Sequence, residues 1–377
     1  MAGRTREQQI HEKRLEQHLP SMPDYVIEFI RSKKRKKYSP STLLSYVHEY
    51  EKFFKWLLKE QLIPLDDNGN LVDKIRDIPY YALEHLRKDN VEYYIDYLTE
   101  EDLNVKKGVI KKRSDAAIQR NINALKSLFN YLTTETENDD GECYFYRNVF
   151  SKISLTKKKV TASRRAKKIS SVILSDKEIH SFIDFVKHKY EKGLSPREHS
   201  SFKRDKERDV ALISLLLGSG IRVSEIASLL ISGVDFKRCE IDIIRKGGKD
   251  DTADVLPSAM EELRIYLDIR KERYKATDND PYVFLTKYNG GAQPISVRAI
   301  QNLINKYTKA FNEGKILSPH KLRHTFASEW IRTGGNIVLL RDQLGHSSIE
   351  TTSLYTNLSQ EERKKVINEM EQVRTPK

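Results

Sequence analysis

Residues 319–325, with the sequence PHKLRHT, place two histidines four residues apart with an arginine between them. On a helix, His320, Arg323 and His324 fall within one arc of roughly 100° and face the same way. Two imidazoles so placed can bind a metal ion, whereas an arginine beside them favours an anion. A zinc hydrolase helix of the H-E-x-x-H kind needs a glutamate where this chain has Lys321, and no clear third ligand is found. The pattern therefore favours an anion site without a metal, with His324 as a packing or hydrogen-bonding residue.

Three further places carry residues that suit the same chemistry. Arg222 and Glu225 follow a Gly-Ser-Gly turn after a leucine-rich run, which suits a cleft, although alone they could be a surface ion pair of ~0.2–1 kcal/mol. Lys246 lies in a glycine-containing turn, where a lysine by itself is ordinary. His346 follows a Leu-Gly pair, and Tyr355 comes nine residues later as the last of the chain's 19 tyrosines. Each feature alone has a structural explanation, so their weight lies in their combination.

Together these residues resemble the active-site pattern of the tyrosine recombinases, the phage integrase family. The residues that match it, in order, are Arg222, Lys246, His320, Arg323, His346 and Tyr355. The resemblance implies phosphoryl transfer without hydrolysis, in which a tyrosine attacks the scissile phosphate of DNA and releases a 5′-hydroxyl. The intermediate is a 3′-phosphotyrosyl link, and because one phosphoester replaces another, neither ATP nor a metal or other cofactor is expected.

The resemblance also assigns a role to each residue. Tyr355 is the expected nucleophile, and Arg222 and Arg323 are expected to clamp the phosphate, because a planar guanidinium bonds two oxygens and stays charged. Lys246 is expected to protonate the leaving 5′-oxygen, and His320 to assist proton transfer from the tyrosine.

Two more residues complete the expected site. His346 is expected to donate a hydrogen bond to a phosphate oxygen. Glu225 is expected to orient Arg222 or His320 without contacting the phosphate itself. Removing one charged donor from such a site should lower the rate by about 10²–10³-fold.

The first part of the chain predicts helices that would support DNA binding. Ser39 followed by Pro40 is a helix start, and Ser114 starts a second helix with apolar residues at helical spacing. Basic runs at 33–37 (KKRKK) and 111–113 (KKR) lie beside these helices. They are either solvated charged faces or contacts to a nucleic-acid backbone, and their repetition near helix starts favours the second interpretation.

A boundary follows these helices. Residues 143–175 contain nine basic residues and no acidic one, which predicts an extended linker over 151–170 that tracks a phosphate backbone. Ser175 and Glu178 predict a capping box at the start of the next helix. Two β-rich runs flank the turn KGGKDD and predict a hairpin. Residues 188–209 are expected to be a long connection between two helices.

We therefore expect a mainly α protein with two domains. The expected parts are an N-terminal extension over 1–20, a helical, SAM-like core-binding domain over 21–150, the linker, and an α+β catalytic domain over 171–377. The resemblance implies that the domains form a C-shaped clamp on double-stranded DNA. It also implies a homo-tetramer assembled through a C-terminal helix, and the alternative is that this helix packs on its own domain.

Composition sets the class of partner. The chain has 377 residues, a net charge of +13 and a pI of about 9.3, which favours phosphate polymers, with an anionic membrane surface as second choice. No apolar run approaches the ~20 residues that a membrane span needs. The N-terminus lacks the apolar core of a secretion signal, and two cysteines are too few for a disulfide framework. We expect a cytoplasmic protein.

Within the family, residues 139–153 and 200–217 are similar to the single-protein Xer recombinases of streptococci and lactococci. This similarity implies that chromosome dimers are resolved at cell division, with an FtsK-type DNA translocase as a candidate partner. Thr356 and Asn357 follow the tyrosine, where Xer proteins commonly have a histidine at the second position. An integrase or excisionase of a phage or conjugative element is therefore the alternative.

Two other classes share parts of the pattern. A DNA-binding regulator or decayed recombinase would keep the basic helices, but the complete set of site residues argues against it. A type IB topoisomerase uses the same covalent chemistry, but the N-terminal helical domain and the Leu-Gly-His context favour recombination.

Overall fold

The computed structural model describes residues 6–65, 69–106, 109–155, 164, 173–245, 247–311, 316–346, 348, 352, 368, 370 and 371. The chain divides into two compact units, one over residues 4–158 and one that begins at residue 159. This division falls inside the segment 151–170 that the sequence predicts as a linker. No helix among the described residues combines the length and apolar character needed to cross a bilayer.

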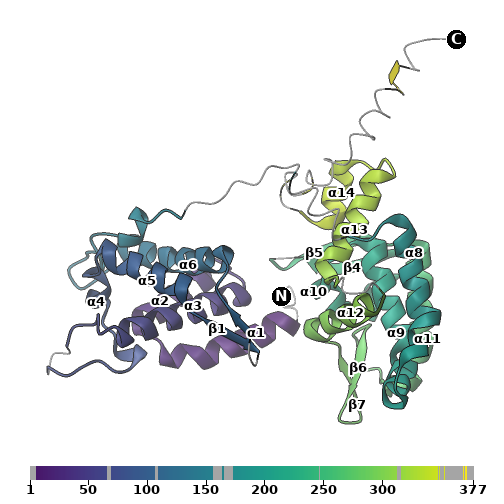
Figure 1. Cartoon of the computed structure of the whole chain (residues 1–377), viewed down its shortest axis with the longest axis horizontal. Coiled ribbons are helices and arrows are strands. Elements are labelled where there is room, and N and C mark those ends of the chain that lie inside the picture. The colour runs from purple at the N-terminus through teal and green to yellow at the C-terminus, as the bar shows by residue number, and fades with distance from the viewer. Residues whose placement is uncertain are drawn as a thin grey trace. The chain divides into compact units, whose positions relative to one another are not determined.

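The first unit is built from helices and one small hairpin (Figure 1). Ser39 and Ser114 cap their helices as predicted, because each hydroxyl accepts a hydrogen bond from a backbone N–H three residues later, at 3.3 Å. The helices are α1 (Arg6–His18), α2 (Asp24–Arg35), α3 (Pro40–Lys59), α4 (Tyr80–Glu84), α5 (Lys88–Glu100) and α6 (Asp115–Thr134), with short 3₁₀ turns at Leu19–Ser21, Ile75–Asp77 and Val149–Lys152. Strands β1 (Leu103–Lys106) and β2 (Val109–Lys111) pair antiparallel.

An aromatic core holds these helices together. Tyr50, Phe53 and Phe54 of α3 are fully buried, and Phe129 of α6 belongs to the same hydrophobic cluster. The Tyr50 hydroxyl donates to the carbonyl of Ala124 at 3.0 Å, which satisfies its polar atom inside the core. Helix α1 packs on α3 and buries Leu15 completely, so the described part of the segment 1–20 is a folded part of this unit.

The basic run at 33–37 has a structural role that the sequence did not predict. Lys33 is only 6% exposed, and its ammonium donates to Glu135 at 3.2 Å and lies 5.1 Å from the ring centre of Phe29. Lys36 binds the same carboxylate at 2.7 Å, and in the second run Arg113 pairs with a glutamate. The prediction that the run contacts nucleic acid is therefore wrong for Lys33, whose charge is turned inward.

The second unit is a helical body with two small antiparallel sheets (Figure 1). Its α-helices are α8 (Asp176–Asp184), α9 (Pro196–Ser219), α10 (Val223–Ala227), α11 (Pro257–Tyr274), α12 (Val297–Phe311), α13 (Pro319–Arg332) and α14 (Ile337–Leu344). A π-helical turn at Phe185–Lys189 and 3₁₀ turns at Tyr190–Gly193 and Ile231–Gly233 connect some of them. The strands are β3 (Val234–Asp235), β4 (Glu240–Arg245) and β5 (Lys249–Asp254) in one sheet, and β6 (Leu285–Tyr288) and β7 (Gly291–Pro294) in the other.

Local predictions for this unit are partly confirmed. Ser175 and Glu178 form the predicted capping box, and the predicted hairpin is present as β4 and β5. The long connection expected over 188–209 is wrong, because α9 begins at Pro196. Glu198 accepts from the backbone N–H of Ser195 at 3.0 Å in a second capping box that extends the helix through this charged stretch.

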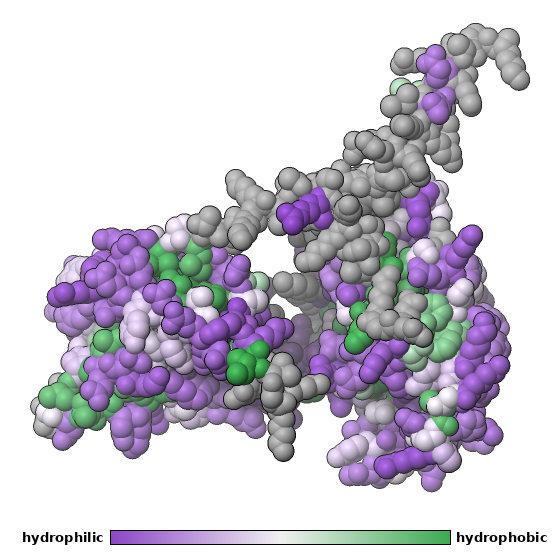
Figure 2. All heavy atoms as spheres, viewed as in Figure 1, coloured by the Kyte–Doolittle hydropathy of each residue, from purple (hydrophilic) through white to green (hydrophobic). Residues whose placement is uncertain are grey.

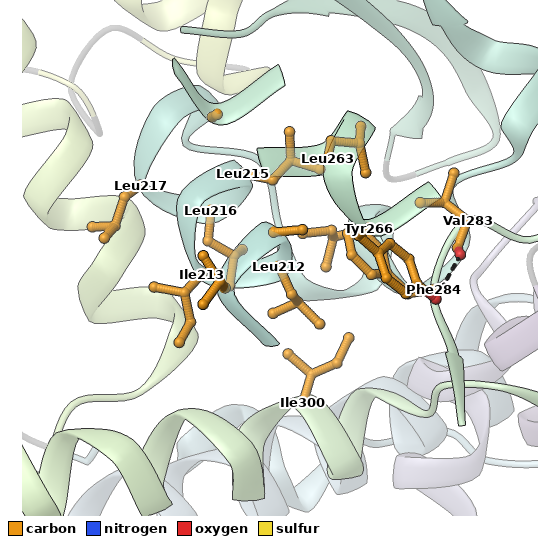
Figure 3. Close-up of a cluster of buried hydrophobic side chains, with 14 of the residues drawn as sticks. Leu212, Ile213, Leu215, Leu216, Leu217, Leu263, Tyr266, Val283, Phe284 and Ile300 are labelled. Atoms are coloured by element: carbon orange, nitrogen blue, oxygen red, sulfur yellow. Dashed lines mark hydrogen bonds between the residues drawn. The ribbon is translucent and has the colours of Figure 1, made fainter. Parts of the chain in front are cut away.

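The core of the second unit lies between α9 and α11 (Figure 3). Leu212, Leu216 and Leu263 are fully buried, and Tyr266 stacks on Phe284 with ring centres 5.5 Å apart. The Tyr266 hydroxyl donates to a backbone carbonyl of the strand region at 3.2 Å, so its polar atom is satisfied. On the face shown in Figure 2, both units are mainly hydrophilic, and hydrophobic side chains form small separate patches.

Helix α9 ends where the candidate site begins. Gly220 adopts a left-handed conformation with a φ of 65°, and a Cβ there would lie 2.3 Å from a ring carbon of Phe326. Only glycine fits this turn, because both the φ angle and the close packing exclude a side chain. The turn therefore brings the residues that follow α9 directly against α13.

Candidate active site

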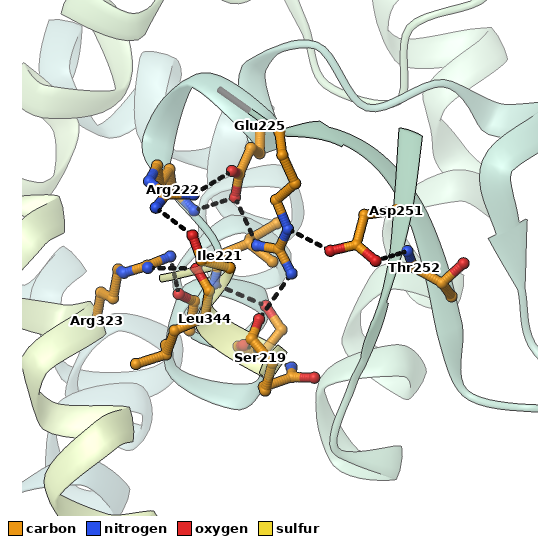
Figure 4. A network of polar contacts seen from close by, with 12 residues as sticks. Ser219, Ile221, Arg222, Glu225, Asp251, Thr252, Arg323 and Leu344 are labelled. Atoms are coloured by element: carbon orange, nitrogen blue, oxygen red, sulfur yellow. Dashed lines mark hydrogen bonds and ion pairs between the residues drawn. The ribbon is translucent and has the colours of Figure 1, made fainter. Parts of the chain in front are cut away.

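Arg222 lies just after the glycine turn, at the start of α10. Its backbone N–H donates to Oε2 of Glu225 at 2.7 Å, and its Nη1 donates to Oε1 of the same carboxylate at 2.8 Å. Its Nη2 donates to the carbonyl of Gly345 at 3.0 Å (Figure 4). The Glu225 side chain is 2% exposed, whereas that of Arg222 is 31% exposed. The buried carboxylate thus holds the guanidinium while leaving part of it open to solvent.

Arg323 is held in a different way, by backbone carbonyls. Its Nη1 donates to the carbonyl of Gly220 at 2.8 Å, and its Nη2 donates to the carbonyl of Leu344 at 2.5 Å. The residue is 3% exposed, and its neighbours Leu322 and Phe326 pack into the core from the same helix, α13. Arg222 and Arg323 are therefore anchored on adjacent carbonyls of one turn.

That turn follows α14 and contains the Leu-Gly-His motif. Gly345 has a φ of 59°, and its N–H donates to the carbonyl of Asp342, so it ends the helix in the left-handed conformation. A Cβ at Gly345 would lie 2.7 Å from Nε of Arg245. The next residue, His346, has its Nδ1 3.0 Å from the hydroxyl oxygen of Thr352, which is fully buried. The motif thus supplies a carbonyl to each arginine and places an imidazole beside them.

The histidines of the site have lowered pKa values. Burial, and after it the charges of Arg323 and Arg222, lower the pKa of His320. Burial also lowers the pKa of His324 and of His346 to about 4, with further contributions from Arg323 and the neighbouring rings. The rings of His320 and His324 meet edge to face with centres 4.4 Å apart. All three imidazoles are therefore neutral at neutral pH, and each can donate one hydrogen bond and accept another.

Arg245 is a site residue that the sequence did not single out. It is the last residue of β4 and only 6% exposed. Its Nε donates to Asp251 at 2.7 Å, its Nη1 to Glu225 at 3.4 Å, and its Nη2 to the carbonyl of Gln343 at 2.7 Å. A signal was available, because side chains alternate along a strand and Arg245 shares a face with the buried residue Ile243. A charged residue on a buried face needs such partners.

Gln343 is a second such residue. Its amide nitrogen donates to the carbonyls of Ser219 and Asp254, both at 2.8 Å, and its amide oxygen accepts from the N–H of Asp254 at 3.1 Å. It therefore connects the ends of α9 and β5 to α14. Nothing in the sequence distinguishes this glutamine from an ordinary polar residue on a helix.

The structure brings together most of the predicted site residues. Arg222, Glu225 and Arg323 converge on the turn that carries His346, and the pKa of His320 responds to both arginines. Lys246 and Tyr355 lie outside the described residues, as does most of the predicted C-terminal helix. Lys246 directly follows Arg245 in the chain, and Tyr355 is three positions beyond Thr352.

Two anchored guanidiniums beside neutral imidazoles suit an anion with several oxygens, such as a phosphodiester. Among the described residues, no three histidine, cysteine, aspartate or glutamate side chains are grouped to hold a metal ion. Residues 173–362, which include this whole site, match the model of the phage integrase family. The chain belongs to the phage integrase family, the tyrosine recombinases. Members of this family are DNA strand-exchange enzymes.

Relatives and solved structures agree with this assignment. The recombinase is 40% identical over 362 residues to tyrosine recombinase XerS of Streptococcus equi subsp. equi, covering 95% of this chain and 98% of the relative. It is 41% identical over 363 residues to tyrosine recombinase XerS of Streptococcus pyogenes, with the same coverage. Its fold resembles that of XerH site-specific recombinase bound to difH substrate in a pre-cleavage complex, with a TM-score of 0.56, 18% identity, and coverage of 86% of this chain and 78% of that chain. The family, the Xer-type similarity and the mainly α fold predicted from the sequence are confirmed.

Proposed function

We propose that this recombinase exchanges strands of double-stranded DNA at a specific site and resolves chromosome dimers at cell division in the cytoplasm. The similarity to proteins named XerS over 95% of the chain supports the biological role, and the net charge of +13 supports a nucleic-acid partner. The anchoring of Arg222 and Arg323 on adjacent carbonyls is the observation that carries the catalytic proposal.

In the proposed reaction, the two guanidiniums bind the non-bridging oxygens of the scissile phosphate. Negative charge on these oxygens grows toward the transition state, so positive groups that are already in place stabilise it more than the ground state. Glu225 fixes Arg222 because one of its oxygens accepts from the backbone N–H of Arg222 and the other accepts from Nη1. His346 adds a hydrogen-bond donor. When its Nδ1 accepts from the hydroxyl of Thr352, the proton of the neutral ring lies on Nε2. Nε2 can then donate this proton in a hydrogen bond to the phosphate.

The proposed cleavage step forms one phosphorus–oxygen bond and breaks another, so it needs no further reactant. The phenolic oxygen of Tyr355 forms a bond to phosphorus as the bond from phosphorus to the 5′-oxygen breaks. The phenolic proton passes to His320, which is able to accept it because its lowered pKa keeps it neutral. Lys246 donates a proton to the departing 5′-oxygen. The 5′-hydroxyl of the partner strand then reverses these steps and releases the tyrosine.

The proposal extends to the assembly on DNA. Strand exchange between two duplexes requires a recombinase at each cleavage position, so we place four copies in the active complex. The C-terminal segment is the proposed link between copies, and an FtsK-type translocase is the proposed accessory partner. Both extensions rest on the family resemblance.

The test is a nicked suicide substrate. Cleavage next to the nick releases a short fragment that carries the 5′-hydroxyl, so the strand cannot be rejoined and the covalent protein–DNA complex accumulates. Native protein should form this complex on its cognate site, and the Tyr355→Phe variant should form none. Absence of a complex with native protein, or its persistence in the variant, would contradict the catalytic proposal. Cells lacking the protein should form filaments with unresolved chromosomes, whereas normal segregation would favour a mobile-element integrase.

A further inference from the structure

The guanidinium of Arg245 joins three elements around the site. It bonds Asp251 across the hairpin in β5, Glu225 in α10 and the carbonyl of Gln343 in α14. Figure 4 shows this network, with Glu225 on the side of Arg222 and Asp251 on the side of the strands. The side chain also lies directly against the backbone of Gly345, as the 2.7 Å approach of a Cβ built there indicates. Arg245 therefore fixes the base of the hairpin to the turn that anchors both phosphate-binding arginines.

The turn of the hairpin is closed by a hydrogen bond from the N–H of Gly248 to the carbonyl of Arg245 at 3.1 Å, and the space around its two glycines is open. Gly247 and Gly248 have φ angles of 92° and 77°, and a Cβ built on either would meet no heavy atom within 4 Å. Two glycines in succession give the turn wide conformational freedom. Lys246 directly follows Arg245 in the chain, so the contacts of Arg245 are the nearest side-chain anchor for its position.

Glu225 connects the hairpin base to the phosphate-binding side. One of its oxygens accepts from Nη1 of Arg222 at 2.8 Å, and the other lies 3.4 Å from Nη1 of Arg245. A carboxylate that is 2% exposed requires such cationic partners, so the positions of the two arginines are linked through it. The hairpin base and the first phosphate clamp thus share one buried charge.

We propose that Arg245 is a positioning residue that holds the β4–β5 hairpin so that Lys246 delivers its proton to the leaving 5′-oxygen. This inference rests on the general-acid role proposed for Lys246. It assigns Arg245 no contact with DNA. Because Arg222 keeps its own bonds to Glu225 and to the carbonyl of Gly345, loss of Arg245 should impair protonation of the leaving group more than binding of the phosphate.

The test compares two suicide substrates, one with the ordinary phosphodiester and one with sulfur in place of the bridging 5′-oxygen. A thiolate leaves without a proton donor, since a thiol, with a pKa of about 8.5, is a far stronger acid than the 5′-alcohol it replaces. On the ordinary substrate, Arg245→Met should form the covalent complex about 10²-fold more slowly than native protein. On the sulfur substrate, its rate should return to within about threefold of native.

Three further variants make the result decisive. Asp251→Asn removes only the negative charge that pairs with Arg245 on the strand side, at a residue whose side chain is 43% exposed. It should therefore fold and show a smaller defect that sulfur also relieves. Arg270→Met removes another buried arginine of the same unit, which bonds carbonyls near Val283, and any loss there should be equal on both substrates. Lys246→Ala should be rescued by sulfur.

The outcomes are distinct. An equal loss for Arg245→Met and Asp251→Asn on both substrates, together with rescue of Lys246→Ala, would overturn the positioning role while leaving the general acid in place. Failure of sulfur to rescue Lys246→Ala would overturn the general-acid assignment and the inference with it. Rescue of Arg245→Met, Asp251→Asn and Lys246→Ala by sulfur, without rescue of Arg270→Met, would support the inference.

Discussion

Arg222 and Arg323 donate to neighbouring carbonyls of the same turn, Arg222 to Gly345 at 3.0 Å and Arg323 to Leu344 at 2.5 Å. Since His346 is the next residue, three groups of the proposed phosphate site depend on the conformation of a single turn. A small change in this turn should therefore affect catalysis more than it affects folding.

Gly345→Ala tests this dependence. Alanine would be strained at a φ of 59°, and its methyl group would lie 2.7 Å from Nε of Arg245, so both the turn and Arg245 must shift. We expect a loss of about 1–3 kcal/mol in the free energy of unfolding, measured with denaturant. Covalent complex formation on the suicide substrate should fall by about 10²-fold.

Gly334→Ala is the matched control for this variant. Gly334 also has a positive φ, of 84°, but a Cβ there meets no heavy atom within 4 Å. Gly334→Ala should therefore lower the free energy of unfolding through backbone strain but leave the cleavage rate unchanged. An equal loss of cleavage activity in both variants would show that backbone strain, rather than the contact with Arg245, controls the site.

Replacing a clamp by a residue of the same charge tests the geometry of phosphate binding. Lysine keeps the charge at Arg323 but cannot bond two carbonyls and a phosphate with a planar fork. Arg323→Lys should lower the cleavage rate by about 10²–10³-fold. Arg264→Lys, on the exposed face of α11, should leave that rate unchanged. A rate near native for Arg323→Lys would show that charge alone suffices.

The lowered pKa values of two histidines predict how the free energy of unfolding depends on pH. The pKa of His324 and of His346 is about 4 in the folded protein, below the 6.5 of an unperturbed histidine. Between pH 6.5 and 4 the unfolded chain therefore binds more protons at these rings, so acid favours unfolding. The stabilisation is complete above pH 6.5 and is lost as the pH falls toward 4. His324→Gln should make the free energy of unfolding less dependent on pH in this window. If the free energy of unfolding of the variant changes with pH as steeply as that of the native protein, the lowered pKa of His324 is contradicted.

DNA binding should show the opposite dependence on pH. A phosphate placed beside His346 raises the pKa of the ring, because the anion stabilises its charged form. The complex then takes up a proton, and DNA affinity should increase as the pH falls from 7 to 5. Titration of the cognate duplex at constant salt measures this, with His346→Gln as the variant expected to lose part of the effect.

Two neighbouring basic residues should have separate roles in the first unit. Lys33 is buried against Phe29 and Glu135, so Lys33→Met should lower the free energy of unfolding by about 1–3 kcal/mol. Arg35 is exposed, and Arg35→Met should leave stability unchanged but weaken DNA binding and reduce its salt dependence. Fluorescence-detected unfolding and a salt titration distinguish the two, and equal effects on stability would contradict this division.

The sequence predicted features that local chemistry determines. The helix starts at Ser39, Ser114 and Ser175 depend on residues three positions away, so they can be recognised in a short window. The start of α9 was missed, because its first turns are so highly charged that they resemble a surface connection. Family, fold class and most site residues came from resemblance to a known pattern.

What the sequence could not predict depends on distant partners. Lys33 is buried because Glu135, 102 residues away, compensates its charge. Arg245 is buried because Gln343, 98 residues away, turns a carbonyl toward it. A basic run or a strand-end arginine has the same sequence pattern whether it faces solvent or a buried carboxylate, so only the tertiary fold separates these cases.

The identity of the nucleophile is the most direct test of the proposed mechanism. The covalent complex trapped on a suicide substrate can be digested with nuclease and protease, and the peptide that carries the nucleotide can be sequenced by mass spectrometry. The mechanism predicts a single 3′-phosphonucleotide on Tyr355. A nucleotide on any other residue, or a link to the 5′ end of the DNA, would contradict it.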